Sequence, residues 1–242
     1  LTLFPFETEI YRRLGGDAIC TGHPIVDDVR EGLAAPSSLP EKTRPRLVLL
    51  PGSRRGELRR LWPPMREAAA RLAARRGLDA FAVRAPGLSE DLYPGAREAG
   101  VRLVSSGMHA LLASADLALV ASGTATLETA LCGAPMVVVY RTSRTNLAIG
   151  RLLVRVPWIS LVNIVAQEAV VPELLQEEVT PERLEREAER LLDSPERRER
   201  IRRSLERVAS ELGPPGASAR AAESVLEAVE GRARAPARAA TR

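Results

Sequence analysis

The chain has few of the side chains that bind metals, stack on nucleic-acid bases or cross membranes. Its two cysteines and two histidines stand at unrelated places, which argues against a structural zinc site. We interpret Cys20 and Cys132 as reduced core residues, as in a cytosolic protein. Aromatic residues make up 3% of the 242 residues, too few for a base-stacking platform, so no nucleic-acid partner is expected. No stretch approaches the roughly 18 uninterrupted apolar residues of a membrane span, and no secretory signal is visible.

Excess basic charge is confined to one short stretch. The formal net charge is +4, and Lys42 is the sole lysine among 35 basic residues. Residues 232–242 hold four arginines and no acid, which leaves 31 basic against 31 acidic residues in a neutral body. We therefore expect residues 232–242 to be a basic, disordered tail.

Short apolar runs alternate with helical patterns through the middle of the chain. Such runs are typical of buried parallel strands. We expect strands at 47–50, 81–84, 101–104, 117–120 and 136–140, and helices from the 51–57 turn to about 76, at 108–114, at 124–132 and at 145–154. This order predicts βαβ units with right-handed crossovers, and hence an α/β fold with a Rossmann-like parallel sheet.

The flanking segments differ in character. A strand–helix–strand pattern at 1–4, 6–14 and 18–21 cannot bury both faces of a sheet alone, so we interpret it as the remnant of a second α/β domain. The chain begins with Leu1 rather than methionine, which suggests a piece of a longer chain. The expected division is 1–30 for this N-terminal remnant, 31–45 for a linker, 46–178 for a nucleotide-binding domain, 179–231 for C-terminal helices and 232–242 for the tail.

The stretch Ala121–Pro135 organises the rest of the chain. Ser122, Gly123 and Thr124 stand where a helix should begin after a buried strand, and unpaired backbone N–H groups there attract an anion. Glu128 lies one turn further on the same face as Thr124, where its carboxylate could bind a sugar diol. The alternative is a helix cap with a surface carboxylate, and local context does not decide between the two.

A second turn follows the strand at 47–50. Gly52 permits a close approach to the backbone, Ser53 offers a hydroxyl, and Arg54 offers a bidentate fork for phosphate. The turn is neither a Walker A loop nor a GxGxxG fingerprint, and a solvated arginine is an equal alternative. Asn163 is an amide within an apolar run, for which a satisfied buried amide is the ordinary explanation. Ligands of parallel sheets bind at strand carboxyl ends, and both turns occupy that position.

Several motifs follow one another along the chain, from residue 1 to about 178. They are Phe4-Pro-Phe-Glu7 with Tyr11, Gly22-His23-Pro24 with Val26-Asp27, Leu50-Pro-Gly-Ser-Arg54 with Glu57, Ala115-Asp116, Ala121-Ser-Gly-Thr-Ala125 with Leu127-Glu128, Pro135-Met-Val137 with Tyr140-Arg141, Ser160-Leu161 with Asn163-Ile164, and Pro172-Glu173-Leu-Leu-Gln-Glu177. In their order and spacing the chain resembles the bacterial lipid-A-disaccharide synthases, glycosyltransferases of the GT-B architecture. Val162 departs mildly from the family, which usually has leucine or proline there.

The resemblance implies transfer of an acylated glucosamine from UDP-2,3-diacylglucosamine to 2,3-diacylglucosamine 1-phosphate, which gives lipid A disaccharide. It implies donor contacts from Ser53, Arg54, Glu57, Ser122, Gly123, Thr124, Glu128 and Asn163. No metal or cofactor is expected, because helix N-termini and positive charge can stabilise the leaving diphosphate. The catalytic base is expected outside this chain, since no nucleophile elbow or acidic pair is present.

The same resemblance implies work at the cytoplasmic face of the cell membrane, with peripheral membrane contact. A homodimer that exchanges C-terminal helices would give their apolar stripes a partner. Two alternatives stay open. One is another UDP-GlcNAc-using GT-B enzyme, such as the peptidoglycan glycosyltransferase or a 2-epimerase, and the other is a truncated, non-catalytic nucleotide-binding chain.

Overall fold

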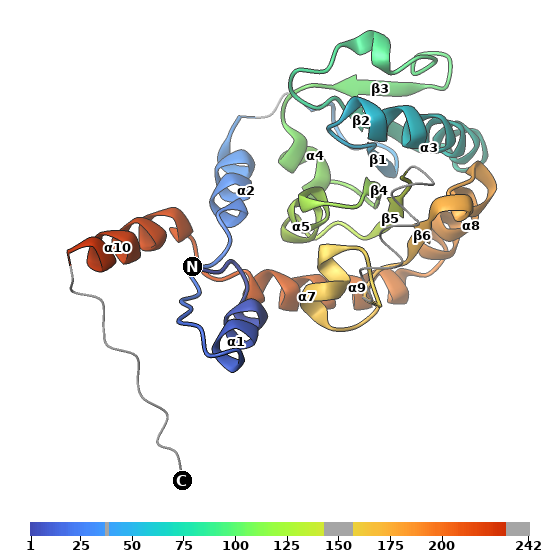
Figure 1. Ribbon diagram of the computed structural model, residues 1–242. Coiled ribbons are helices and arrows are strands. Elements are labelled where there is room, and N and C mark those ends of the chain that lie inside the picture. Colours follow the sequence, from blue (N-terminus) through green and yellow to red (C-terminus); the bar gives the residue numbers. More distant parts are fainter. Residues whose placement is uncertain (37–38, 143–156, 231–242) are drawn as a thin grey trace. The chain divides into compact units, whose positions relative to one another are not determined.

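The computed structural model describes residues 1–36, 39–142 and 157–230 (Figure 1). The expected helix at 145–154 and the expected tail at 232–242 lie outside these residues. The chain divides into two compact units, one formed by Leu1–Asp28 with Ser210–Arg242 and the other by Val29–Ala209. Across the described residues, no helix is long and apolar enough to cross a membrane.

The larger unit contains a six-stranded sheet in the order β3-β2-β1-β4-β5-β6, and every neighbouring pair is parallel. Its strands are β1 (Arg46–Leu50), β2 (Asp79–Val83), β3 (Val101–Val104), β4 (Leu117–Ala121), β5 (Met136–Tyr140) and β6 (Glu173–Leu175). Strands β1 and β4 are buried along their whole length, as expected for apolar runs covered on both faces. The α/β class and the parallel sheet are therefore confirmed. Strand β6 was not expected, because three residues are too few to give a recognisable run.

Helices cover both faces of this sheet. The helices of the larger unit are α3 (Arg55–Arg76), α4 (Met108–Ala113), α5 (Thr124–Leu131), α7 (Leu161–Ala166), α8 (Pro181–Leu192) and α9 (Pro195–Glu211), with the short 3-10 helices η1 (Glu90–Leu92) and η2 (Gln176–Glu178). Helices α3 and α8 pack together on one face, while α4, α5 and α7 lie on the other (Figure 1). This split follows from right-handed crossovers that run outward from β1 in opposite directions.

Ion pairs join α3 to α8. Arg75 lies 2.7 Å from Glu185, and Arg76 lies 2.6 Å from Asp193. Glu185 is buried, so its carboxylate is more than a solvated surface charge.

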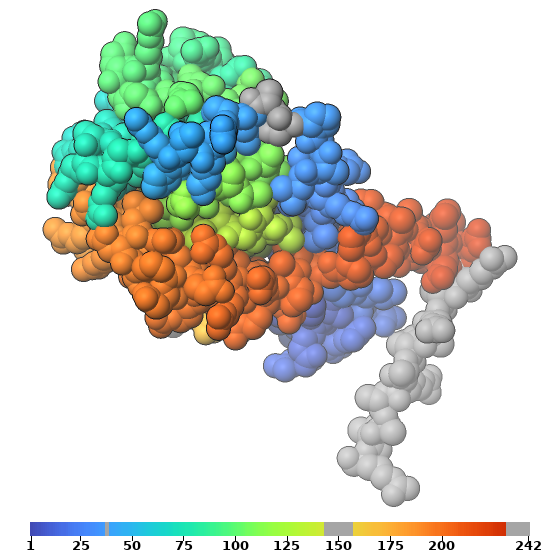
Figure 2. Space-filling view, turned by 180° about the vertical axis from the view of Figure 1, so that it is seen from behind, coloured from blue at the N-terminus to red at the C-terminus, as the bar shows by residue number. Residues whose placement is uncertain are grey.

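Helices α8 and α9 form part of the molecular surface, seen in orange in the rear view (Figure 2).

The smaller unit contains α1 (Pro5–Arg13) and α10 (Ala217–Val229). The strands expected at 1–4 and 18–21 were wrong, since a single parallel bridge joins Thr2 to Cys20. No further strand accompanies them within the described residues, so a ladder cannot extend. Cys20 is exposed and Cys132 half-buried, so the interpretation of Cys20 as a core residue was also wrong.

Helix α2 (Ile25–Ala34) begins in the smaller unit and continues into the larger one. Its last turn, residues 31–34, falls in the stretch expected to be a linker, and Val29 in the preceding turn is buried, 3% exposed. The Asp27 carboxylate accepts hydrogen bonds from the Gly216 backbone N–H at 2.9 Å. This contact ties the start of α2 to the turn before α10.

Candidate functional site

The two turns singled out in the sequence lie at the same edge of the sheet. Strands β1 and β4 are neighbours, with Leu50 in register with Val120, so the turns that follow them leave side by side. From β1 the chain builds the sheet in one direction through β2 and β3, and from β4 in the other through β5 and β6. This reversal is the topological switch point, the place at which open α/β sheets bind their ligands.

The first turn is shaped by a glycine and an ion pair. Gly52 has φ +107, and a Cβ at this position would lie 2.8 Å from Glu57 Oε2. Arg54 Nη1 donates to Glu57 Oε1 at 2.9 Å. The Arg54 side chain is 82% exposed, so it can turn toward a ligand. Arg54 also caps α3 without a side-chain hydrogen bond, which leaves the helix N–H groups open to an anion.

The second turn places a bare backbone at the start of α5. Gly123 has φ 150 and ψ −163, a conformation open almost only to glycine. Among the described residues, no atom beyond its two chain neighbours lies within 4 Å of the place where its Cβ would be. Thr124 is exposed at the first helical position, and Ser122 is half-buried. The Ser122 hydroxyl donates to the Ile159 carbonyl at 3.0 Å.

Glu128 faces His109 across the α4–α5 contact. His109 Nε2 lies 3.3 Å from Glu128 Oε1, and the two side chains are only 14% and 20% exposed. The same carboxylate adds to the effect of burial in raising the pKa of Cys132 to about 12. Sequence reasoning missed His109, because a histidine that opens a short helix gives no local sign of its partner 19 residues away.

Asn163 is buried, and both polar atoms of its amide have partners. Its Oδ1 accepts from the Val171 N–H at 3.0 Å, and its Nδ2 donates to the Val171 carbonyl at 2.9 Å and to Glu173 at 2.8 Å. Glu173 also accepts the N–H groups of Ile159 and Ser160, both at 2.9 Å. This cluster therefore fixes the segment whose carbonyl accepts the Ser122 hydroxyl.

Gln176 belongs to the motif at residues 172–177, but sequence reasoning gave it no role in the site. It follows β6 at the carboxyl edge of the sheet, with φ +53, and its Oε1 accepts from the Thr142 N–H at 3.3 Å. Its Nε2 is buried and makes no hydrogen bond to any described residue. A buried amide N–H without a partner is unusual, and a bound ligand is one way to complete it. The feature that singles out Gln176 is this buried, unpaired nitrogen, which the sequence does not reveal.

The arrangement suits a molecule that carries both an anion and a diol. Two helix N-termini without side-chain caps and one exposed arginine face the anion position, and the Glu128 carboxylate lies one turn along α5. Over the ranges that the structure describes, no three His, Cys, Asp or Glu side chains gather to hold a metal ion.

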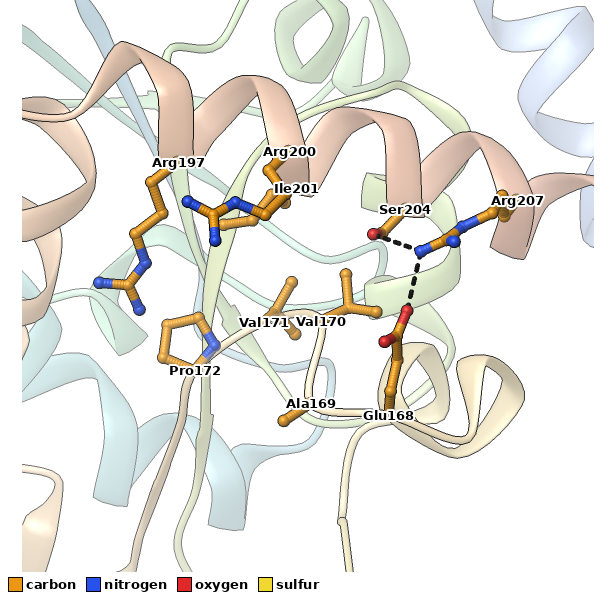
Figure 3. A pocket seen from close by; sticks show the side chains of 10 residues that line it. All are labelled: Glu168, Ala169, Val170, Val171, Pro172, Arg197, Arg200, Ile201, Ser204 and Arg207. Atoms are coloured by element: carbon orange, nitrogen blue, oxygen red, sulfur yellow. Dashed lines mark hydrogen bonds and ion pairs between the residues drawn. The ribbon is translucent and has the colours of Figure 1, made fainter.

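A pocket of about 390 Å³ lies elsewhere in the larger unit, between α9 and the residues before β6 (Figure 3). Its lining includes Val170, Val171, Pro172, Arg197, Arg200 and Ile201. Arg207 crosses one end, where it donates to Glu168 at 2.8 Å and to Ser204 at 2.9 Å. Residues 168–172, which line the pocket, lead into the amino end of β6, whereas both turns follow the carboxyl ends of their strands. The pocket is therefore separate from the candidate site.

Solved structures share the fold. A putative UDP-N-acetylglucosamine 2-epimerase from Listeria monocytogenes superposes with a TM-score of 0.62 at 18% identity, over 94% of this chain and 59% of that one. CalG4, the calicheamicin glycosyltransferase, gives 0.54 at 22% identity, over 82% of this chain and 45% of that one. These similarities confirm the expected GT-B type of fold.

Relatives found by sequence share a higher identity with this chain than these two solved structures do. A lipid-A-disaccharide synthase of Myxococcus xanthus (strain DK1622) is 43% identical over 240 residues, which cover 94% of this chain and 61% of the relative. The lipid-A-disaccharide synthase of Syntrophus aciditrophicus (strain SB) is 41% identical, over 94% of this chain and 62% of the relative. The chain thus spans less than two thirds of the length of these relatives. The family model for lipid-A-disaccharide synthetase matches residues 1–229, and the chain belongs to this family.

Proposed function

We propose that this chain supplies the UDP-sugar donor site of a glycosyltransferase of lipid A biosynthesis. The reaction joins UDP-2,3-diacylglucosamine to 2,3-diacylglucosamine 1-phosphate and gives lipid A disaccharide. The observation that carries the proposal is the meeting of two uncapped helix N-termini at the β1–β4 switch point. Residues 46–178 form the nucleotide-sugar-binding domain in this proposal, and 1–30 belong to the acceptor-side domain.

The donor diphosphate occupies the crevice between the two turns. Ser53 and Arg54 bind it from the first turn, while Ser122, Gly123 and Thr124 supply the second side. Glu57 orients Arg54 through an ion pair of 2.9 Å between Glu57 Oε1 and Arg54 Nη1. As the glycosidic bond to the diphosphate breaks, negative charge grows on the leaving UDP, and aligned N–H groups with an arginine stabilise that charge.

Glu128 binds the ribose hydroxyls, since ribose follows the diphosphate in UDP and Glu128 follows Thr124 on the same helix face. Asn163 belongs to the same site through the cluster that fixes Ile159 and Ser160. A base outside this chain activates the acceptor sugar. The acylated substrates place the enzyme at the inner face of the cell membrane as a peripheral protein, and exchange of C-terminal helices would give a homodimer.

Calorimetry with UDP tests the donor site. Arg54→Gln should weaken UDP binding by roughly 10- to 100-fold, the value of a hydrogen bond to a charged group. Arg55→Gln is the matched control, because it removes the same charge from the next residue, which is also exposed. A folded parent chain that does not bind UDP would overturn the proposal.

Turnover separates the alternatives. A chain that binds UDP-GlcNAc and epimerises it at C2 would be an epimerase, and a chain that binds without turnover would be a nucleotide-binding protein only. Release of UDP that depends on the acylated acceptor, measured on the full-length protein, supports the synthase.

A further inference from the structure

We propose that His109 is a positioning residue that holds the Glu128 carboxylate in place for the donor ribose, and that Gly32 leaves the space that the His109 ring needs for this contact. This inference rests on the proposed function of Glu128. It assigns roles to two residues that lie outside the diphosphate crevice, on α4 and α2.

The contact between the two side chains is specific. His109 Nε2 lies 3.3 Å from Glu128 Oε1, within hydrogen-bond distance, and neither side chain is more than 20% exposed. With the proton on Nε2, the imidazole donates to one carboxylate oxygen and leaves the other free to accept ribose hydroxyls. His109 is the one side-chain donor that the described residues give to Glu128, and without it the half-buried glutamate would sample several rotamers.

The other side of the imidazole packs against α2. A Cβ at position 32 would overlap Nδ1 of His109 and would lie 2.9 Å from both Cγ and Cε1. Because Cγ lies at the base of the ring, a small tilt cannot relieve this overlap. Rotation of the His109 side chain about its own Cα–Cβ bond relieves the overlap, and that rotation would carry Nε2 away from Glu128. Gly32 therefore fits this position because it has no side chain.

Recognition of a diol depends on this arrangement. A carboxylate that is fixed before the ligand arrives loses less conformational entropy on binding than a mobile one. Holding Glu128 should thus raise affinity for ribose specifically, with no effect on the diphosphate contacts at the two turns. This separation provides a readout that general damage to the fold would not reproduce.

The test compares three ligands by calorimetry on the full chain: UDP, 2′-deoxy-UDP and inorganic pyrophosphate. For the parent chain, UDP should bind more tightly than 2′-deoxy-UDP, and Glu128→Gln should reduce this preference. His109→Ala should reduce it by roughly 5- to 10-fold, with pyrophosphate affinity unchanged. His109→Gln should restore it, since the glutamine amide nitrogen can reach the place of Nε2, whereas the shorter asparagine of His109→Asn should not.

Gly32→Ala gives an independent perturbation. Alanine is the better helix former, which offsets part of the cost of moving the His109 ring, so the melting temperature should change little. The preference for UDP over 2′-deoxy-UDP should nevertheless fall, as in His109→Ala. Lost ribose preference in a chain that is not destabilised would support the chain of contacts from Gly32 to Glu128.

The outcomes are distinguishable. A parent chain without any ribose preference, matched by Glu128→Gln, would overturn the proposed role of Glu128. A preference lost in Glu128→Gln but kept in His109→Ala would overturn the positioning role alone. Equal losses of UDP and pyrophosphate affinity in His109→Ala would also overturn it, because they would indicate a purely structural residue.

Discussion

Replacing Asn163 with alanine should mainly destabilise the fold rather than remove a ligand contact. The side chain is 1% exposed, and its amide makes three hydrogen bonds, two to Val171 and one to Glu173. Asn163→Ala leaves the buried N–H and C=O of Val171 unpaired, and each such group costs about 1–3 kcal/mol. With the weakened Glu173 contact, we expect a loss of about 3–5 kcal/mol in the free energy of unfolding.

Urea denaturation followed by circular dichroism measures this loss. The melting temperature should fall by roughly 10 °C, given the size of the larger unit. Glu168→Gln is the control, because its exposed ion pair with Arg207 should contribute no more than about 1 kcal/mol. A loss below about 1 kcal/mol for Asn163→Ala, together with much weaker UDP binding, would refute the reasoning and place the amide against the ligand.

Three further predictions concern the backbone of the site and the pH dependence of stability. Gly123→Ala should lower the free energy of unfolding by about 1–3 kcal/mol in urea denaturation, because its conformation is costly for any other residue. Gly52→Ala should weaken UDP binding in calorimetry, since φ +107 is strained for alanine and the new Cβ, 2.8 Å from Glu57 Oε2, would shift the turn that carries Ser53 and Arg54. Burial lowers the pKa of His23, so its stabilising contribution is complete above the unfolded value near 6.5 and is lost as the pH falls below it. His23→Gln should flatten this pH dependence, and an unchanged slope would contradict it.

The sheet and its two turns were predictable because their signals are local. A continuous apolar run, as at Leu117–Ala121, indicates a buried parallel strand, and glycines indicate where the chain turns. The order of the strands in the sheet could not be predicted from such local signals. The turns at Gly52 and Gly123 were nevertheless assigned to one site, because ligands of parallel sheets bind at strand carboxyl ends. The register of Leu50 with Val120 then placed them side by side.

Contacts between distant residues could not be predicted. Nothing around His109 indicates Glu128, and nothing around Asn163 indicates the Glu173 carboxylate, because each pairing depends on how helices and strands pack. The errors at residues 1–4 and 18–21 have a related cause. A strand needs neighbours, and the local pattern of an apolar run is the same whether or not they are present.

The pairing of charges near the two turns explains how an anion could bind beside three carboxylates. Glu57 is paired with Arg54, Glu128 with His109, and Glu173 with backbone and amide N–H groups, so each already has a donor. The Arg54–Glu57 pair is exposed and therefore contributes no more than about 1 kcal/mol, less than a hydrogen bond from an arginine to a phosphate. Arg54 can thus leave Glu57 for the diphosphate at little cost, while the buried contacts of Glu173 keep the second turn in place. A site of this kind is ordered before its ligand arrives, with one weakly paired arginine that can turn to the ligand.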